Sequence, residues 1–249
     1  MSYATTVLAD NPVLYWRLEE TSGNAADSSV NSHTGTVFGA NLDTAGPTDL
    51  LGSAAAFDGI DDYIIGEGAN AGVLNIDGNK PKSIECWVKI LTWPADTTHV
   101  MFVGSFNTGR AFAFITGSGA NNWIFNLWGG TGWDIPFTVA DSVGRWVHLV
   151  ATHDGTHARV YADGVEAGWG ERTLDTHPTD QDFQIARRPS PLRYVHGVMD
   201  EVAVYDTALS PARVEAHYDA AYAPADDPAN LQATVDGSDV HLTWDPVGT

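Results

Sequence analysis

Several acidic and amide side chains have the types that a calcium site needs. Ca²⁺ takes about six to eight oxygen ligands from carboxylates, amides and loop carbonyls. Asp27 and Asn31 begin and end a short polar segment that is able to wrap a cation, and Asp200 arrives from a distant strand. We therefore predict a calcium site formed by Asp27 and Asp200, with Asn31 next and Glu20 last among the candidate ligands.

The same acidic residues also allow a purely structural interpretation. Asp27 would then cap a turn, and Asp200 would pair with an arginine such as Arg17. A second acidic group at residues 58–62 surrounds a glycine. Turn chemistry explains that group, since Asp and Gly dominate hairpin turns.

Tryptophan residues in the middle of the sequence suggest a sugar platform, because exposed rings can stack on pyranose faces. Trp123 and Trp128 differ by an odd number of positions, so on one strand they point to opposite faces, and one of them must face outward or lie on a rim. The other candidates for carbohydrate contact are Trp133, Asn126, Asp134 and the Gly-rich segment 129–132 as a ligand loop. With nine Trp in the chain, the alternative is that these rings fill the core and the space between subunits.

Catalytic chemistry has little support in the sequence. The chain has no Gly-x-Ser-x-Gly nucleophile motif and no His-Glu-x-x-His zinc motif. Its single cysteine, Cys86, lies in an alternating apolar segment, which excludes an intramolecular disulfide and favours a buried thiol. We therefore expect no enzyme activity and no catalytic residues.

The charge balance excludes several partners. The 12 Lys+Arg and 32 Asp+Glu give a formal net charge of −20. A nucleic-acid partner needs clustered basic side chains, and an anionic membrane surface repels an acidic protein. We expect neither a signal peptide nor a membrane span, because residues 1–4 show no basic segment followed by an apolar stretch and no apolar stretch approaches roughly 18 residues. We expect no nucleic-acid binding and no membrane insertion.

The sequence pattern predicts that mostly short strands position these residues. Alternating β-branched and aromatic residues predict strands, and the Asp-Gly pairs at 154–155 and 163–164 predict a three-stranded meander over 146–169. Helical signals are confined to residues 3–9 and 210–218. Many strands with few helices favour an all-β antiparallel sandwich or jelly roll. The predicted strands are 83–91, 99–106, 110–116, 123–128, 146–153 and 157–162.

The composition changes near the end of the chain. Residues 223–228 have the Pro, Ala and Asp content of a linker. Residues 229–249 resemble the first two strands of a fibronectin type III domain, which needs about 90 to 100 residues to close its sandwich. We predict one domain over residues 1–222, a linker, and the truncated start of a second unit.

Six segments in a fixed order have the pattern of a known sandwich family. They are 13–20 (VLYWRLEE), 26–35 (ADSSVNSHTG), 56–64 (AFDGIDDYI), 83–88 (SIECWV), 146–152 (WVHLVAT) and 197–205 (GVMDEVAVY). Through these segments, residues 3–222 resemble the laminin-G-like, concanavalin A-like jelly-roll family. The resemblance implies two antiparallel sheets of roughly six or seven strands each, packed face to face. It also implies a calcium ion shared between the early acidic loop and Asp200, although Val30 stands where the family usually has Gly.

The resemblance also bears on function. Glucanases of this superfamily carry a Glu-x-Asp-x-x-Glu strand, which this chain lacks. Residues 3–18 are similar to the start of such domains in bacteriophage virion proteins. We therefore predict a non-catalytic virion module, part of a tail, fibre or capsid-decorating protein, that binds host-surface carbohydrate or packs between virion subunits and that could be a homo-oligomer. The alternative is a bacterial extracellular or cell-surface carbohydrate-binding module of a multidomain protein.

Overall fold

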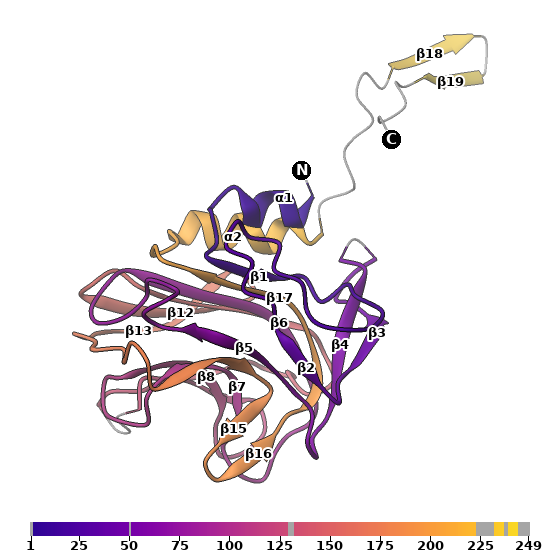
Figure 1. Ribbon diagram of the computed structural model, residues 1–249. Helices are drawn as coiled ribbons and strands as arrows, with labels where there is room; N and C mark the ends of the chain where they lie inside the picture. The colour runs from indigo at the N-terminus through magenta and orange to yellow at the C-terminus, as the bar shows by residue number, and fades with distance from the viewer. Residues whose placement is uncertain (1, 50, 129–131, 223–231, 237–238, 244–249) are drawn as a thin grey trace.

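The protein folds as a sandwich of two antiparallel sheets with two short helices. The structure is a computed structural model that describes residues 2–49, 51–128, 132–222, 232–236 and 239–243. An eight-stranded sheet and a seven-stranded sheet face each other, and both helices cover the outside of the eight-stranded sheet (Figure 1). The predicted antiparallel jelly-roll sandwich with a short helix near each end of the domain is therefore confirmed.

The eight-stranded sheet contains strands from both ends of the domain. Its long strands β6 and β17 lie side by side at the centre, and β1 pairs with β17 off the main path. In spatial order the strands are β13 (Val165–Glu171), β12 (His157–Ala162), β11 (Val147–His153), β6 (Lys82–Thr92), β17 (His196–Tyr205), β4 (Ser53–Asp58) and β3 (Asn41–Ala45), with β1 (Leu14–Trp16) beside β17.

The seven-stranded sheet consists mainly of strands from the middle of the chain. A hairpin of β15 (Arg187–Pro189) and β16 (Leu192–Tyr194) follows its strand β14. In spatial order the sheet is β10 (Ile135–Thr138), β9 (Asn122–Asn126), β8 (Ala111–Thr116), β7 (His99–Gly104), β14 (Gln181–Ile185), β5 (Tyr63–Asn70) and β2 (Thr36–Phe38).

The main core lies between the two sheets, because successive side chains of a strand point to opposite faces. In β6 the side chains of Ile84, Cys86 and Val88 enter this core, whereas Glu85 and Trp87 point to the helix-covered face. Burial raises the pKa of the Cys86 thiol well above its ordinary value, followed by a smaller effect of the Glu85 charge. Cys86 is therefore the buried thiol that the alternating pattern indicates.

The predicted meander is confirmed as β11, β12 and β13. Asp163 and Gly164 connect β12 to β13 with φ angles of 51° and 79°. A two-residue hairpin turn of this kind needs left-handed backbone at both positions, which Asp tolerates and Gly adopts without cost. The local sequence thus determines where the strands reverse.

The two helices pack on the outer face of the eight-stranded sheet. They are α1 (Tyr3–Leu8) and α2 (Pro211–Ala220). Ser210 caps α2 by accepting a hydrogen bond from the Arg213 amide at 3.3 Å, and Pro211 occupies the first helical position, as the sequence predicts. Val7 and Val214 join a second apolar cluster with the sheet residues that face them. Among the described residues, neither helix has the length and apolar character of a membrane span.

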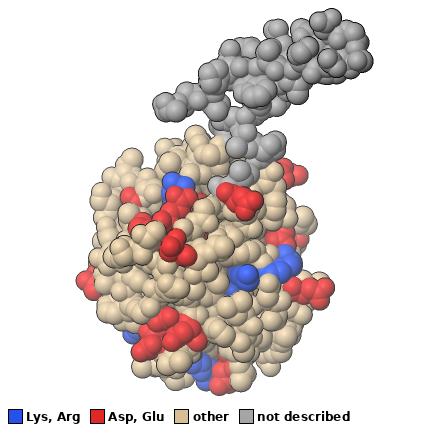
Figure 2. Space-filling view, turned by 90° about the vertical axis from the view of Figure 1, so that its right-hand side faces the viewer, with Lys and Arg blue, Asp and Glu red and all other residues tan. Residues whose placement is uncertain are grey.

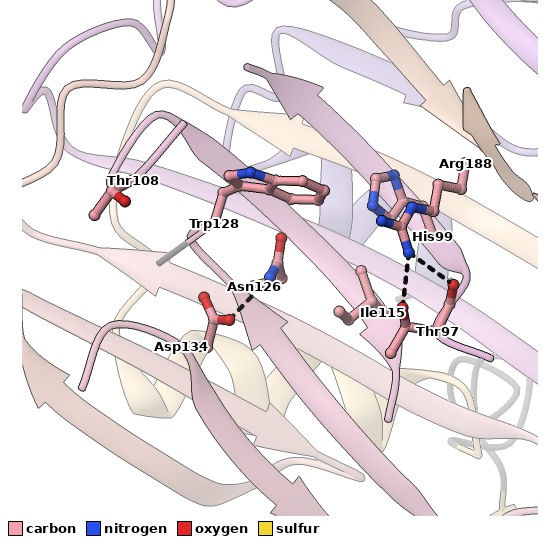
Figure 3. Close-up of a pocket in the computed structure, with 8 residues that line it drawn as sticks. All are labelled: Thr97, His99, Thr108, Ile115, Asn126, Trp128, Asp134 and Arg188. Carbon is pink, nitrogen blue, oxygen red and sulfur yellow. Dashed lines mark hydrogen bonds between the residues drawn. The ribbon is translucent and has the colours of Figure 1, made fainter. Parts of the chain in front are cut away.

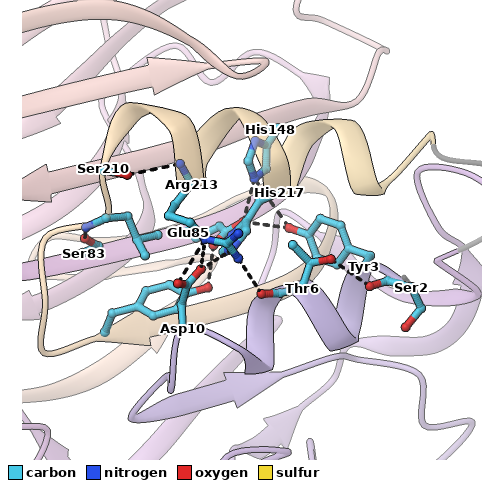
Figure 4. A network of polar contacts seen from close by, with 12 residues as sticks. Ser2, Tyr3, Thr6, Asp10, Ser83, Glu85, His148, Ser210, Arg213 and His217 are labelled. Carbon is cyan, nitrogen blue, oxygen red and sulfur yellow. Dashed lines mark hydrogen bonds and ion pairs between the residues drawn. The ribbon is translucent and has the colours of Figure 1, made fainter.

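A buried polar network ties both helices to the sheet (Figure 4). The Glu85 carboxylate accepts hydrogen bonds from the Tyr3 hydroxyl at 2.8 Å and from the Tyr205 hydroxyl at 2.7 Å. The His148 and His217 rings lie 2.8 and 2.9 Å from its oxygens. One fully buried carboxylate therefore connects α1, α2 and three strands of the sheet.

Charged side chains lie mostly on the surface. In Figure 2 the acidic side chains form several separate groups over the visible face and outnumber the basic ones. This distribution agrees with the net charge of −20 and with the many polar turns of the sequence.

The last part of the chain is described only as a hairpin. Strands β18 (Gln232–Asp236) and β19 (Asp239–Thr243) pair antiparallel. The predicted linker, residues 223–228, lies outside the described residues. The fibronectin-like assignment of residues 229–249 stays a prediction.

Candidate functional site

A cavity of about 330 Å³ opens on the outer face of the seven-stranded sheet (Figure 3). This face is the one turned away from the main core, since Phe102 and Ala113 form a cluster separate from the residues between the sheets. Loops and the β15–β16 hairpin complete the walls. The lining residues are Thr97, His99, Thr108, Ile115, Asn126, Trp128, Asp134 and Arg188.

Stacked rings form one part of the cavity. The His99 ring stacks on Phe102 with centroids 4.6 Å apart, and Phe102 stacks on Phe106 at 5.0 Å. The Trp128 ring packs against Phe106 at 4.8 Å and meets the His99 ring edge to face at 6.1 Å. Trp128 is only half-buried, so part of its indole remains available to a ligand.

The position of Trp128 depends on a turn that ends β9. The strand stops at Asn126, and Trp128 has a left-handed backbone with φ 56°, a conformation uncommon outside Gly and Asn. The Arg188 guanidinium lies 5.5 Å from the centroid of the Trp128 ring, within cation–π range. Residues 129–131 of the predicted ligand loop lie outside the described residues.

Asn126 and Asp134 meet at the end of the cavity opposite Arg188 (Figure 3). The Asn126 amide nitrogen donates to Asp134 Oδ2 at 3.1 Å, and the Leu127 amide donates to Asp134 Oδ1 at 2.9 Å. Asn126 is 4% exposed, and its Oδ1 atom has no hydrogen-bond partner among the described residues. A buried acceptor of this kind is costly unless a ligand or water donates to it.

His99 adds a second unsatisfied polar group to the cavity. The side chain is 1% exposed, and neither ring nitrogen has a hydrogen-bond partner among the described residues. Burial, together with the nearby positive charge of Arg188, lowers the pKa of His99 to about 3. The ring is therefore neutral at ordinary pH and offers one N–H donor and one acceptor.

The structure brings together three of the five predicted carbohydrate-contact residues, namely Trp128, Asn126 and Asp134. Trp123 is fully buried between the sheets, where its ring meets Trp93 edge to face and its indole N–H donates to Ser142 Oγ at 3.2 Å. Trp133 is half-buried against the main core and does not line the cavity. Trp123 therefore lies in the core and Trp133 packs against it, as expected if these rings contribute to packing and not to a sugar platform.

Sequence reasoning did not find His99 and Arg188 as site residues. His99 begins β7 and Arg188 lies in β15, so only the sheet pairing of β7 with β14 brings them together. The sequence shows Arg187 and Arg188 as an adjacent basic pair in an acidic chain, but no spacing connects them to the tryptophans.

Among the predicted metal ligands, Asp27 acts as a turn cap. Its Oδ1 atom accepts from the amides of Tyr15 at 2.9 Å and Ser29 at 2.8 Å. Its Oδ2 atom accepts from the His33 amide at 2.7 Å and the Ser29 hydroxyl at 2.8 Å. Four donors surround the carboxylate, which is the arrangement that the turn-cap interpretation predicts.

Asn31 and Glu20 support the same early loop. The Asn31 amide donates to the Val13 carbonyl at 3.0 Å, and Glu20 Oε1 accepts from the Ala26 amide at 2.8 Å. The Glu20 Oε2 atom is buried and has no hydrogen-bond partner among the described residues. Asn31 thus presents its amide nitrogen to the backbone.

Asp200 lies in a buried acidic cluster at β17. The Asp200 Oδ2 and Glu201 Oε1 atoms are buried with no hydrogen-bond partner among the described residues. Burial, and then repulsion from Glu201, raises the pKa of Asp200 well above its ordinary value, and burial raises the pKa of Glu201 to about 8. The nearest cation is Arg17, whose Nε atom is 4.0 Å from Glu201 Oε1 and which also pairs with Glu19.

Two glycines pack closely against this cluster. A Cβ on Gly46 would lie 3.1 Å from Asp200 Oδ2, and a Cβ on Gly52 would lie 3.1 Å from Glu19 Oε1. The Gly46 amide donates to the Gly52 carbonyl at 2.9 Å, so both carboxyl groups lie beside the turn that joins β3 to β4. Carboxylate and backbone oxygens are the donor types that suit calcium.

The acidic group 58–62 forms a turn. Ligand atoms of Asp58, Asp61 and Asp62 lie within 4.8 Å of one another. The carboxylates accept from backbone amides, with the Asp58 amide donating to Asp62 Oδ2 at 2.9 Å and the Ile60 amide donating to Asp58 Oδ1 at 2.7 Å. These bonds support the turn interpretation of the sequence.

Comparison with known families gives one match. Residues 58–215, which include most strands of both sheets and all eight residues that line the cavity, match the family described as the concanavalin A-like lectin/glucanases superfamily, of laminin G type. A search of curated protein sequences finds no match.

Solved structures share the fold at low sequence identity. Domain 4 of an extracellular arabinanase from Geobacillus stearothermophilus, in complex with arabinotriose, is 20% identical with a TM-score of 0.55, and the match covers 84% of this chain and 98% of that domain. The binding domain of botulinum neurotoxin DC, in complex with SialylT, is 14% identical with a TM-score of 0.63, covering 85% of this chain and 52% of that one. The sialidase of Trypanosoma rangeli is 16% identical with a TM-score of 0.64, covering 84% of this chain and 33% of that enzyme.

Proposed function

The chain belongs to the concanavalin A-like lectin/glucanases superfamily, and we propose that it is a non-catalytic module that binds carbohydrate in the cavity around Trp128. One observation carries the proposal: a half-buried indole stands beside buried polar atoms of Asn126 and His99 that have no partner among the described residues. An aromatic face with a few convergent polar groups is the usual composition of a sugar site.

The polar groups of the cavity suit binding better than hydrolysis. Glycosidases need a pair of carboxyl groups across the scissile bond, commonly about 5 to 9 Å apart. Asp134 is the one carboxyl group among the described residues that line the cavity, and it accepts bonds from Asn126 and the Leu127 amide. A single engaged carboxylate holds hydroxyl groups but does not provide the acid and base of hydrolysis.

The structural relatives support the same substrate class. The arabinanase domain that this fold resembles over 98% of its length is described with arabinotriose, and the toxin domain is described with SialylT. Since the chain spans only about half of the toxin domain and a third of the sialidase, the activities of those proteins do not transfer to it.

Binding to a glycan array tests the proposal. The wild-type protein should bind at least one surface polysaccharide, and Trp128→Ala should weaken that binding about tenfold or more, as expected for an aromatic anchor of a site. Trp169→Ala is the matched control, because Trp169 is 59% exposed on β13 and does not line the cavity. Absence of binding to every glycan, or equal losses in the two variants, would refute the site.

We further propose that the module belongs to a phage virion, where it would attach to host-surface carbohydrate or pack between virion subunits. The support is the similarity of residues 3–18 to the start of such domains in virion proteins. Mass spectrometry and immunogold labelling of purified particles test this placement. Detection of the protein only in culture fluid or on bacterial surfaces would favour the alternative, a bacterial extracellular carbohydrate-binding module.

We also propose a structural calcium ion in the space between Asp200 and Glu19. The support is the unpartnered, buried Asp200 Oδ2 atom and the nearby Glu19 carboxylate, which lie beside the paired glycines Gly46 and Gly52. A divalent cation would supply positive charge to the buried Asp200 carboxylate, since Arg17 pairs with Glu201 and Glu19 instead. The ion would tie β17 to the hairpin between β3 and β4.

Thermal unfolding with calcium or with a chelator tests this ion. A site filled at a hundredfold excess of calcium over its Kd adds about 2.7 kcal/mol to the free energy of unfolding. Calcium should therefore raise the melting temperature of the wild type but not of Asp200→Asn. Asp27→Asn is the control, which should lose stability and keep the calcium response. A wild-type melting curve that calcium and chelator leave unchanged would rule out the ion.

A further inference from the structure

The cavity around Trp128 has opposite electrostatic character at its two ends. Figure 3 shows Asp134 and Arg188 on opposite sides, with the rings of Trp128 and His99 between them. Asp134 is already held by Asn126 and by the Leu127 amide. The ends therefore differ in what they can recognise, and the Arg188 end carries the positive charge.

Arg188 has no carboxylate partner among the described residues. Its Nη1 atom donates to the Thr97 hydroxyl at 2.8 Å and to the Thr97 carbonyl at 3.3 Å, and its Nε atom donates to the Ser190 carbonyl at 3.1 Å. These acceptors are neutral oxygens. The neighbouring Arg193, in contrast, pairs with Asp96 at 3.1 Å. In a chain of net charge −20, an arginine without a carboxylate partner in a cavity is notable.

The guanidinium of Arg188 is held in place but not saturated. A guanidinium has five N–H donors, and the three bonds to Thr97 and Ser190 use the donors of Nε and Nη1. The two donors of Nη2 make no hydrogen bond to the described residues. Burial, followed by repulsion from Arg193, lowers the pKa of Arg188 from its ordinary value despite the opposing charge of Asp96, and the charge of a bound anion would offset both effects.

The groups beside Arg188 complete a subsite for a sugar that carries an acid group. Neutral His99 offers a donor and an acceptor, and the Asn126 Oδ1 atom accepts from hydroxyl groups. The Trp128 ring provides the apolar surface for a pyranose face. Since His99 is neutral, Arg188 is the one charged group among the described lining residues at this end.

We propose that the cavity selects an acidic sugar, with the ligand carboxylate bound to Arg188, the pyranose ring on Trp128 and hydroxyl groups on Asn126 and His99. This inference rests on the proposed carbohydrate-binding function and specifies its ligand class. An arginine suits this task because its planar guanidinium donates two hydrogen bonds to a carboxylate in a fixed geometry.

Titration calorimetry with matched sugars tests the selectivity. The probes are the methyl glycosides of glucuronic acid and glucose, 3′-sialyllactose and lactose, and a sulfated galactoside. In at least one pair the acidic sugar should bind about tenfold more tightly than its neutral partner, as expected for a charge-assisted hydrogen bond. Arg188→Gln should remove this preference, because it lowers the affinity for the acidic sugar more than the affinity for its neutral partner.

Two further variants separate charge from folding. Arg187→Gln makes the same change at the neighbouring arginine, which stacks on Tyr63 at 4.3 Å outside the cavity, and should keep the acid preference. Arg188→Lys keeps the positive charge and should retain part of the preference.

The outcomes distinguish this inference from the function on which it rests. Equal affinity for acidic and neutral sugars, or a preference that survives Arg188→Gln, would overturn the acidic-sugar inference while carbohydrate binding stands. Tighter binding of the sulfated sugar than of every carboxylated one would overturn the carboxylate assignment. Failure of all sugars to bind the wild type would refute the proposed function itself.

Discussion

Replacing Glu85 by Gln should destabilise the protein strongly, because this one side chain holds both terminal helices. The substitution keeps the shape of the side chain but removes the charge that His217 and His148 face at 2.9 and 2.8 Å. An amide also presents an N–H₂ group to a site lined with donors. Breaking a buried ion pair by changing one partner costs about 3 to 5 kcal/mol of unfolding free energy. For a domain of this size, that loss lowers the melting temperature by roughly 6 to 20 °C.

The pH dependence gives the same network a second signature. Burial alone would raise the pKa of Glu85, but the two histidines outweigh it and hold the pKa well below 4.5. Burial alone would lower the pKa of His217, but Glu85 and Asp10 outweigh it and raise the pKa above 6.5. Because the pKa of Glu85 is lowered by folding, its contribution to the free energy of unfolding is full above about pH 4.5 and is lost on acidification. Because the pKa of His217 is raised by folding, its contribution is full below about pH 6.5 and is lost as the pH rises. The contribution is therefore largest between about pH 4.5 and 6.5.

Urea unfolding of the wild type and Glu85→Gln at several pH values measures both effects. Glu166→Gln is the matched control, because its carboxylate pairs with Arg159 at 3.7 Å on the surface, with 41% of the side chain exposed. An exposed pair of this kind contributes about 0 to 1 kcal/mol. A Glu85→Gln loss no larger than that of the control, or a difference from the wild type that does not peak in this pH window, would refute the reasoning.

Three further predictions concern other buried groups. Trp123→Ala should cost about 3 to 5 kcal/mol of unfolding free energy in denaturant titration, because the ring is fully buried, and Trp128→Ala should cost less. The Cys86 thiol should react with Ellman's reagent in denaturant but not in the native protein, and fast native labelling would contradict its burial. Burial lowers the pKa of Lys82 to about 7, so the unfolded chain binds an extra proton between about pH 7 and 10 and the free energy of unfolding should rise over that range. Lys82→Met should remove this rise, and a rise that persists in the variant would assign it to another group.

The alternating pattern of the chain was sufficient to predict the sandwich. The predicted strands, the Asp-Gly turns and the Ser210 helix cap all depend on residues within a few positions of one another. These features can be predicted from the sequence because turn geometry and side-chain direction depend on residues close together in the chain. Alternation on one strand also predicted that Trp123 and Trp128 lie on opposite sides. Trp123 is in the core and Trp128 packs on the outer face, but β9 ends at Asn126, so the turn after the strand and not alternation places Trp128.

The early acidic loop shows where local reasoning stops. The sequence predicted that Asp27 could hold a cation or cap a turn, and both roles need the same residue type. Only the folded chain shows four donors around Asp27 and an unpartnered carboxylate oxygen at Asp200. The donors around Asp27 lie within 12 residues of it in the sequence, whereas the surroundings of Asp200 include Gly46, which is more than a hundred residues away.

What the sequence by itself determined is the fold, the acidic surface and three of the residues around the cavity. The tertiary structure decided which tryptophan faces outward, and it added His99 and Arg188 from strands distant in the chain. The physical reason is that the pattern of a single strand specifies which of its side chains share a face of the sheet. The order and register of the sheet specify which side chains of different strands become neighbours. The proposed ligand class depends on that second kind of information, because Arg188 meets Trp128 only after the sheet has formed.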